Sequence, residues 1–239
     1  MFKQHVQGKH TLLSHPSYEN QVNLNWFNAD YWQQQNKIVG AKKGRAMAWF
    51  FKNNELTAVL RHYWRGGLVG KLLSDQYLYL GFEQTRVYKE FALMAQLIEL
   101  GLNVPTPIAA KVTRSGLIYR GDIITEAVTG AKSVLDILVE RALTESELTS
   151  IATTIALFHR KGVYHADLNI NNILFNDTGQ IYIIDFDRGE IKTPALQWQQ
   201  SNMERLKRSF LKEQGRNPVF NWQASDWQAL YVCYTKLKR

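Results

Sequence analysis

The stretch Tyr164-His-Ala-Asp-Leu-Asn-Ile-Asn-Asn-Ile-Leu174, with Ile183-Ile-Asp-Phe-Asp187 shortly after it, decides the fold of this chain. Short apolar segments lie on either side of the turn-like sequence Asn176-Asp-Thr-Gly179, and this pattern predicts a hairpin. The hairpin would return the chain so that Asp185 lies beside Asn172. Polar side chains are therefore expected to gather where the hairpin begins and ends.

Three side chains in these stretches carry the oxygen atoms that phosphoryl transfer to a hydroxyl requires. Asp167 is predicted to face the acceptor hydroxyl. Asn172 and Asp185 are predicted to hold Mg²⁺ against the phosphates of ATP, because amide and carboxylate oxygens are hard ligands that Mg²⁺ prefers. The run from His165 to Asn172 reads H-x-D-L-x-x-x-N, which resembles the catalytic loop of protein kinases. His165 is interpreted as a hydrogen-bonding support for this loop.

Two positions depart from the protein-kinase pattern. Asp187 stands where kinases have glycine, and it is interpreted either as a further metal or substrate contact or as a cap of the following turn. Ala166 replaces the arginine of the H-R-D motif, so regulation by a phosphorylated loop is not expected. The chain also has no A-P-E segment after Asp185, which favours a small-molecule or glycolipid acceptor over a protein.

The remaining pattern predicts the α+β class and a bilobal, protein-kinase-like fold. Residues 1–126 are expected to form a mainly antiparallel β lobe that contains one helix over residues 86–100. Its predicted strands cover residues 46–51, 56–61, 108–112, 117–119 and 122–126.

Residues 127–239 are expected to form the second, mainly helical lobe. Ser133-Val-Leu-Asp136 and Thr144-Glu-Ser-Glu147 are capping boxes that predict helix starts. A helix over residues 202–214 would close the pattern.

The N-terminal lobe is expected to bind the phosphates of the nucleotide. Gly40 and Gly44 lie in a sequence that is either a phosphate cradle or a plain turn. Arg61 stands where kinases carry a lysine, Lys71 is a second candidate for the same cation, and Glu90 in the helix is the expected ion-pair partner. Near the end of this lobe, the position of Glu126 and Val128 in the order of elements predicts that their backbone bonds the adenine.

On these residues the chain resembles the family of lipopolysaccharide-core kinases, in particular those that act on 3-deoxy-D-manno-octulosonic acid (Kdo). The segments that carry the resemblance are residues 61–71, 86–91, 101–110 and 202–210. The resemblance implies that ATP phosphorylates the 4-hydroxyl of Kdo on a Kdo-lipid A precursor. It also implies a peripheral enzyme on the cytoplasmic face of a Gram-negative inner membrane.

Composition is consistent with an anionic partner. The chain has 239 residues, a formal net charge of +8 and one cysteine, so no disulfide within the chain is possible. No apolar run is long enough for a spanning helix, which predicts a soluble or peripheral protein. The basic side chains of the helix over 202–214 could either contact an anionic membrane surface or form a solvated face. No nucleic acid is expected, since no recognition motif is present.

Other functions stay open on sequence grounds. The chain could phosphorylate another small molecule or sugar, of the heptose or aminoglycoside type. It could also be a catalytically silent binding module with a kinase fold, although the presence of Asp167, Asn172 and Asp185 argues against that.

Overall fold

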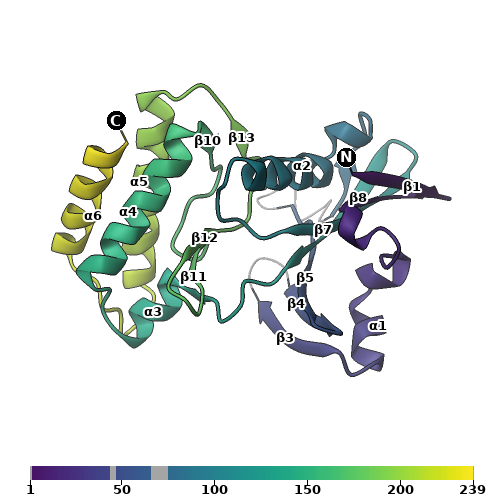
Figure 1. The fold of residues 1–239 in the computed structure, drawn as a ribbon, viewed down its shortest axis with the longest axis horizontal. Coiled ribbons are helices and arrows are strands. Elements are labelled where there is room, and N and C mark those ends of the chain that lie inside the picture. Colours follow the sequence, from purple (N-terminus) through teal and green to yellow (C-terminus); the bar gives the residue numbers. More distant parts are fainter. Residues whose placement is uncertain (1, 44–46, 66–74, 239) are drawn as a thin grey trace. The chain divides into compact units, whose positions relative to one another are not determined.

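The computed structural model describes residues 2–43, 47–65 and 75–238 of the chain. These residues divide into two compact units, of which the first is Met1–Ala95 with Pro105–Ala127 and the second is Gln96–Val104 with Val128–Arg239 (Figure 1). The main division after Ala127 lies one residue from the boundary predicted after residue 126. The segment from 96 to 104, which the sequence placed in the first lobe, belongs to the second unit.

The first unit is built on an antiparallel sheet, to which the described part of the chain contributes eight strands in the order β1-β2-β7-β8-β5-β4-β3, with β6 beside β8. The strands are β1 (Lys3–Gln7), β2 (His10–Ser14), β3 (Ile38–Lys43), β4 (Met47–Asn53), β5 (Leu56–His62), β6 (Tyr77–Leu78), β7 (Pro107–Ser115) and β8 (Ile118–Glu126). The strands predicted over residues 46–51 and 56–61 are confirmed as β4 and β5, which pair antiparallel. The predicted helix is confirmed as α2 (Arg86–Glu99).

Strand β8 is continuous, so the predicted break between residues 119 and 122 is wrong. Gly121 lies within the strand and makes room for α2. A Cβ atom at Gly121 would lie 2.1 Å from Cγ2 of Val87, which is fully buried. Only glycine therefore lets the helix approach the sheet this closely.

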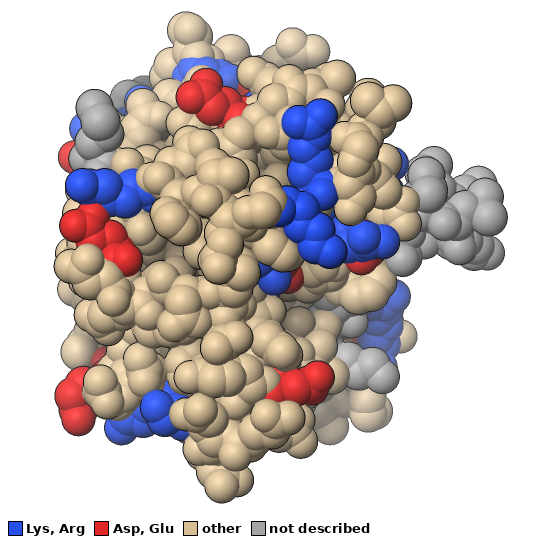
Figure 2. Space-filling view, turned by 90° about the vertical axis from the view of Figure 1, so that its right-hand side faces the viewer, with Lys and Arg blue, Asp and Glu red and all other residues tan. Residues whose placement is uncertain are grey.

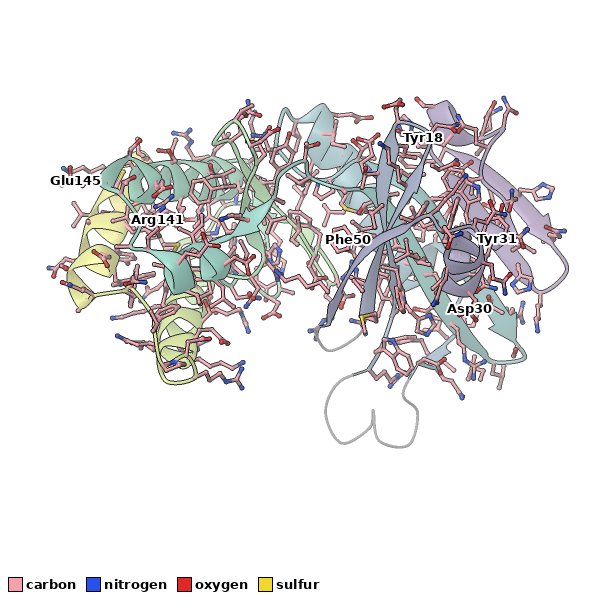
Figure 3. The ribbon with its side chains drawn as sticks, turned by 90° about the horizontal axis from the view of Figure 1, so that it is seen from below. Tyr18, Asp30, Tyr31, Phe50, Arg141 and Glu145 are labelled. Carbon is pink, nitrogen blue, oxygen red and sulfur yellow. The ribbon has the colours of Figure 1, made fainter. Side chains whose placement is uncertain are left out.

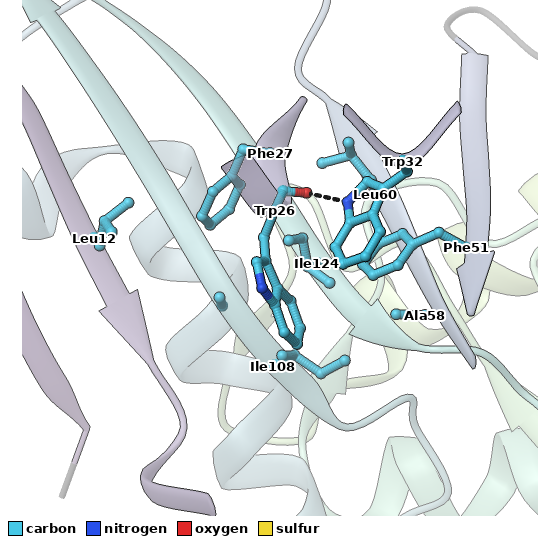
Figure 4. Packing of buried hydrophobic residues seen from close by; sticks show 10 residues of the cluster. Leu12, Trp26, Phe27, Trp32, Phe51, Ala58, Leu60, Ile108 and Ile124 are labelled. Atoms are coloured by element: carbon cyan, nitrogen blue, oxygen red, sulfur yellow. Dashed lines mark hydrogen bonds between the residues drawn. The ribbon is translucent and has the colours of Figure 1, made fainter. Parts of the chain in front are cut away.

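An aromatic cluster covers the other face of the sheet (Figure 4). The short helices η2 (Leu24–Phe27) and α1 (Ala29–Gln34) supply Trp26 and Trp32. The ring of Trp32 stacks on Phe51 of β4 with a centroid distance of 4.2 Å, and its Nε1 donates to the carbonyl of Trp26 at 2.9 Å. The cluster buries Ala58 and Leu60 of β5 and Ile124 of β8 on this face of the sheet, whereas the opposite face of β5 is only partly buried.

The second unit is mainly helical. Its helices are α3 (Val134–Glu140), α4 (Glu145–Arg160), α5 (Leu196–Gln214) and α6 (Ala224–Leu237), and its short strands are β9 (Lys132–Ser133), β10 (Val163–Tyr164), β11 (Ile173–Phe175), β12 (Ile181–Ile183) and β13 (Glu190–Ile191). Both predicted capping boxes are confirmed at the starts of α3 and α4; Figure 3 labels Glu145, the first residue of α4. The α+β class and the predicted sequence of a strand-rich unit followed by a helical one are confirmed.

Two expectations for the end of the chain are wrong. Helix α5 begins at Leu196 and not near residue 202, and a further helix, α6, follows it. Helix α6 is held against α4 by the buried Tyr234, whose hydroxyl lies 2.7 Å from Nδ1 of His159. In the described part of the chain, no helix is both long and apolar enough to cross a membrane.

Candidate active site

The loop between β10 and β11 fixes the main chain of Asp167 and leaves its carboxylate exposed. The backbone N–H of Asp167 donates to Nδ1 of His165 at 3.1 Å. Its carbonyl accepts from the side-chain amides of Asn169 and Asn172 at 2.8 and 3.0 Å. The carboxylate forms no hydrogen bond or ion pair with another described residue. A fixed backbone that carries an unpaired carboxylate is what a base for an incoming hydroxyl requires.

His165 has one defined tautomer because both of its ring nitrogens have obligatory partners. Nδ1 accepts from the Asp167 N–H, so the proton must be on Nε2, which donates to the carbonyl of Ile184 at 3.0 Å. The ring is 3% exposed, and burial is the main cause that lowers its pKa, so the ring is neutral at pH 7. The predicted supporting function of His165 therefore has a geometric basis: the ring joins the Asp167 loop to the segment before Asp185.

The hairpin of β11 and β12 brings Asn172 and Asp185 together along the backbone. Ile173 pairs with Ile183, and the N–H of Ile184 donates to the carbonyl of Asn172 at 3.0 Å. Asp185, the next residue, has a φ of 66°, a left-handed conformation that is uncommon outside glycine, asparagine and aspartate. Such local strain is typical of functional positions.

These residues offer oxygen ligands but no cluster of charged ligands. In the described ranges no group of three or more His, Cys, Asp or Glu side chains is arranged to hold a metal ion. The oxygen donors at the hairpin are one amide, on Asn172, and the carboxylate of Asp185. Such a pair suits a hard cation that takes its remaining ligands from water or substrate phosphates.

Phe186 anchors the segment that follows β12. Its ring is fully buried, stacks on Phe158 of α4 with a centroid distance of 6.2 Å, and meets the ring of His165 at 4.9 Å. The N–H of Gly189 donates to the carbonyl of Phe186 at 2.7 Å, which closes a turn around Asp187. Asp187 therefore lies within the turn, and both interpretations of this residue stay open: a metal or substrate contact, or a cap of the turn.

Two polar residues of helix α5, Asn202 and Ser209, bond the backbone of the Asp167 loop, and neither was predicted from the sequence. Asn202 is fully buried; its Oδ1 accepts from the N–H of His165 at 3.2 Å and its Nδ2 donates to the His165 carbonyl at 3.1 Å. Ser209 accepts from the N–H of Ile170 at 3.2 Å. The available signal was the position of Asn202 on the apolar face of a helix, beside Met203 and Leu206.

In the first unit the predicted ion pair between Arg61 and Glu90 is formed. The guanidinium of Arg61 binds one carboxylate oxygen of Glu90, and the hydroxyl of Tyr63 donates to the other. The Glu90 side chain is 1% exposed and that of Arg61 28%. Lys71, the second candidate for this cation, lies outside the described residues.

The glycines of the expected phosphate cradle differ in position. Gly40 is in strand β3, at an irregularity in its pairing with β4, and not in a loop as the sequence suggested. A Cβ atom at Gly40 would make only ordinary contact with Phe50, at 3.8 Å, so the strand itself does not require glycine at this position. Gly44 lies outside the described residues.

Glu126 and Val128 lie at the boundary of the units, and each is held within its own unit. Glu126 ends β8, where its N–H donates to the carbonyl of Thr106 at 2.8 Å and its carboxylate accepts from the hydroxyl of Tyr18, which Figure 3 labels. Burial, with the bond to Glu126, raises the pKa of Tyr18 to about 12. The carbonyl of Val128 accepts from the N–H of Ala131 at 3.3 Å.

Positive charge is not evenly distributed on the strand-rich unit. On the face shown in Figure 2, Lys and Arg side chains form one group toward the upper right and are elsewhere interspersed with Asp and Glu. The net charge of +8 thus does not form a continuous strip on that face.

Comparison with known proteins gives a family match over most of the chain. The sequence model of the lipopolysaccharide kinase (Kdo/WaaP) family matches residues 29–234. Proteins named 3-deoxy-D-manno-octulosonic acid kinase are similar: one from Vibrio parahaemolyticus is 44% identical over 85% of both chains, and one from Vibrio vulnificus is 41% identical over 98% of both. Another, from Stenotrophomonas maltophilia, is 44% identical over 90% of this chain and 85% of its own. Among solved structures, WbdD with a kinase inhibitor gives a TM-score of 0.46 at 17% identity, over 84% of this chain and 46% of the WbdD chain.

Proposed function

Since the chain belongs to the lipopolysaccharide kinase (Kdo/WaaP) family, we propose that it transfers the terminal phosphoryl group of ATP to the 4-hydroxyl of Kdo on a Kdo-lipid A precursor. One observation carries this proposal: the carboxylate of Asp167 is exposed and has no partner among the described residues, while its backbone is held at both the N–H and the carbonyl. The similarity to proteins named Kdo kinase supports the choice of acceptor.

Asp167 would orient the acceptor hydroxyl and accept its proton as the oxygen attacks phosphorus. Positioning contributes much of the rate in phosphoryl transfer, because the protein has little covalent chemistry to perform. The bonds to His165, Asn169 and Asn172 would keep the Asp167 backbone from shifting during this step.

Asn172 and Asp185 would hold Mg²⁺. Their amide and carboxylate oxygens fit the preference of this ion, and the hairpin register supports their joint action. When bound, Mg²⁺ would neutralise charge on the phosphates of ATP.

For the nucleotide, we propose that Arg61, fixed by the buried Glu90, contacts ATP phosphates, with Lys71 as the other candidate. Gly40 and Gly44 would let backbone N–H groups approach the phosphates of ATP. The backbone of Glu126 and Val128 would bind adenine.

We further propose that the protein associates peripherally with the cytoplasmic face of the inner membrane of a Gram-negative cell. The exposed residues Lys207, Arg208, Leu211 and Lys212 of α5 support this, since a basic surface with an apolar residue attracts anionic lipid headgroups. Co-sedimentation with anionic vesicles, lost with zwitterionic vesicles or at high salt, is the expected result. Equal sedimentation with both vesicle types would contradict it.

The activity is tested by mass spectrometry of a Kdo-lipid A precursor after incubation with the protein, ATP and Mg²⁺. The expected product is heavier by one phosphoryl group, and NMR of the product locates the phosphate on the Kdo ring. Parallel reactions contain a heptose-bearing acceptor or an aminoglycoside. Phosphorylation of either of these, with none of the Kdo acceptor, would overturn the proposed substrate.

A further inference from the structure

Arg205 differs from the other basic residues of α5. Lys207, Arg208 and Lys212 are exposed, whereas Arg205 is partly buried. Its Nε atom is buried and has no hydrogen-bond partner among the described residues. Buried polar atoms nearly always have a partner, and a guanidinium that lacks one at the edge of a functional loop indicates a missing ligand.

The position of Arg205 on α5 places it along the Asp167 loop. Asn202, Arg205 and Ser209 are three and four residues apart, so they share one face of the helix. Asn202 bonds the backbone of His165, and Ser209 bonds the backbone of Ile170. Arg205 lies between these two anchors, as Asp167 lies between His165 and Ile170.

Electrostatics agree with this placement. The charge of Arg205 is among the causes that lower the pKa of His165, although burial is the main one, and the charges of Asp185 and Asp167 oppose it. Arg205 nevertheless forms no ion pair with Asp167 or with any other described residue. The two opposite charges therefore lie in one region without neutralising each other directly.

We propose that Arg205 binds the carboxylate of the acceptor sugar and thereby positions the hydroxyl of that sugar at Asp167. This inference rests on the proposed function. The acceptor is an octulosonic acid and so carries a carboxylate, and the planar guanidinium donates two parallel hydrogen bonds to such a group. A carboxylate and a hydroxyl of one sugar are only a few bonds apart, so neighbouring side chains can hold both.

A different function for Arg205 would be to offset the charge of Asp167. In that case its loss would lower kcat and shift the pH profile of the reaction, while the KM for acceptor would not change. Recognition of the carboxylate predicts the reverse: a higher KM for acceptor with kcat and the pH profile largely retained.

The experiment compares wild type, Arg205→Met and Arg205→Lys on two acceptors, the Kdo-lipid A precursor and its Kdo methyl ester. Arg216→Met is the control, since this exposed arginine just beyond α5 has Glu213, at 3.2 Å, as its one ion-pair partner in the described part of the chain. Wild type should prefer the acid by about 10- to 100-fold in KM, the range expected for charge-assisted hydrogen bonds. Arg205→Met should bind acid and ester alike, Arg205→Lys should recover part of the preference, and the KM for ATP should not change.

Three results would overturn the proposal. Arg205→Met could retain the preference for the acid, or it could raise the KM for ATP, or wild type could fail to distinguish acid from ester. A precursor without lipid phosphates serves as a further arm: if the effect of Arg205→Met disappears there, the ligand is a phosphate and not the carboxylate.

Binding of both acceptors is also measured without ATP, in detergent micelles. If wild type binds the acid in preference to the ester, Arg205→Met loses that preference, and no phosphate is transferred, the proposed function fails and the assignment of Arg205 to the carboxylate stands. If wild type transfers phosphate and Arg205→Met behaves like Arg216→Met, only the assignment of Arg205 fails.

Discussion

Replacement of Asn202 by alanine should separate the two contributions of α5, to stability and to catalysis. Asn202 is fully buried, and both atoms of its amide bond the main chain of His165, at 3.2 Å to the N–H and 3.1 Å to the carbonyl. Asn202→Ala removes both partners at once. The protein cannot supply others without moving the loop, so either the two backbone groups stay unpaired or the loop shifts.

The magnitude follows from this count of bonds. An unsatisfied buried group costs about 1–3 kcal/mol, so two of them are expected to lower the free energy of unfolding by roughly 3–4 kcal/mol. A total stability of about 5–15 kcal/mol would tolerate that loss. A shift of the loop by about 1 Å would also lower kcat, by about 10²-fold, because Asp167 follows His165 by two residues.

The matched control is Gln199→Ala on the same helix. Gln199 is also buried, but its amide makes one bond, to the carbonyl of His159 at 3.2 Å, outside the Asp167 loop. Urea unfolding should show a loss of about 1–2 kcal/mol for Gln199→Ala with kcat nearly unchanged. Both rates are measured at a temperature where both variants are fully folded. If Asn202→Ala then has the same kcat as Gln199→Ala, α5 does not position the loop for catalysis.

Three further outcomes are expected from the contacts described. Asp167→Ala should lower kcat about 10²- to 10⁴-fold with almost no change in melting temperature, because the carboxylate is exposed and has no partner among the described residues. Steady-state kinetics and calorimetry measure the two effects, and a wild-type rate would exclude Asp167 as the base. Arg61→Met should lower the free energy of unfolding by about 2 kcal/mol, because the buried carboxylate of Glu90 loses this cation. The double variant Arg61→Met with Glu90→Gln should recover part of that loss, and a double variant less stable than Arg61→Met would contradict the reasoning. Burial lowers the pKa of His159 from 6.5 to about 4, so the unfolded chain binds the proton more readily and the contribution of His159 to stability is present above pH 6.5 and lost as the pH falls toward 4. Urea unfolding at pH 7 and 4.5 should therefore show about 2 kcal/mol less acid destabilisation in His159→Gln than in wild type, and equal acid destabilisation would refute the assignment.

The sequence predicted the parts of the candidate site that depend on local order. The hairpin between Asn172 and Asp185 is encoded by two apolar segments and a turn, and its register follows from them. The pair of Arg61 and Glu90 was also predictable, because kinases place a cation and a carboxylate at these points in the order of elements. The bonds from Asn202 to His165 were not predictable: the position of Asn202 on an apolar helix face indicates that it is buried, but the sequence does not show which backbone 37 residues away it bonds.

Other elements of the fold were not predicted, for separate physical reasons. Strand β1 has every residue exposed, so it shows no alternation of apolar and polar side chains to predict it. The continuity of β8 through Gly121 was not predicted, because the sequence does not show that Val87 packs over this glycine. Helix α6, by contrast, carries a readable signal: Trp227, Leu230 and Tyr234 follow the spacing of one helix face.

The division of tasks within the Asp167 loop explains why so many asparagines occur there. Asn169 and Asn172 bond the carbonyl of Asp167, and His165 bonds its N–H, so the polar side chains of the loop are used to fix main chain. Amides and a neutral imidazole do this without adding charge, whereas carboxylates in the same places would repel both Asp167 and the phosphates of ATP. The one carboxylate of the loop is then left exposed, without a partner among the described residues. A change as small as Asn172→Asp would remove the amide that donates to the Asp167 carbonyl and would add a second charge to the loop.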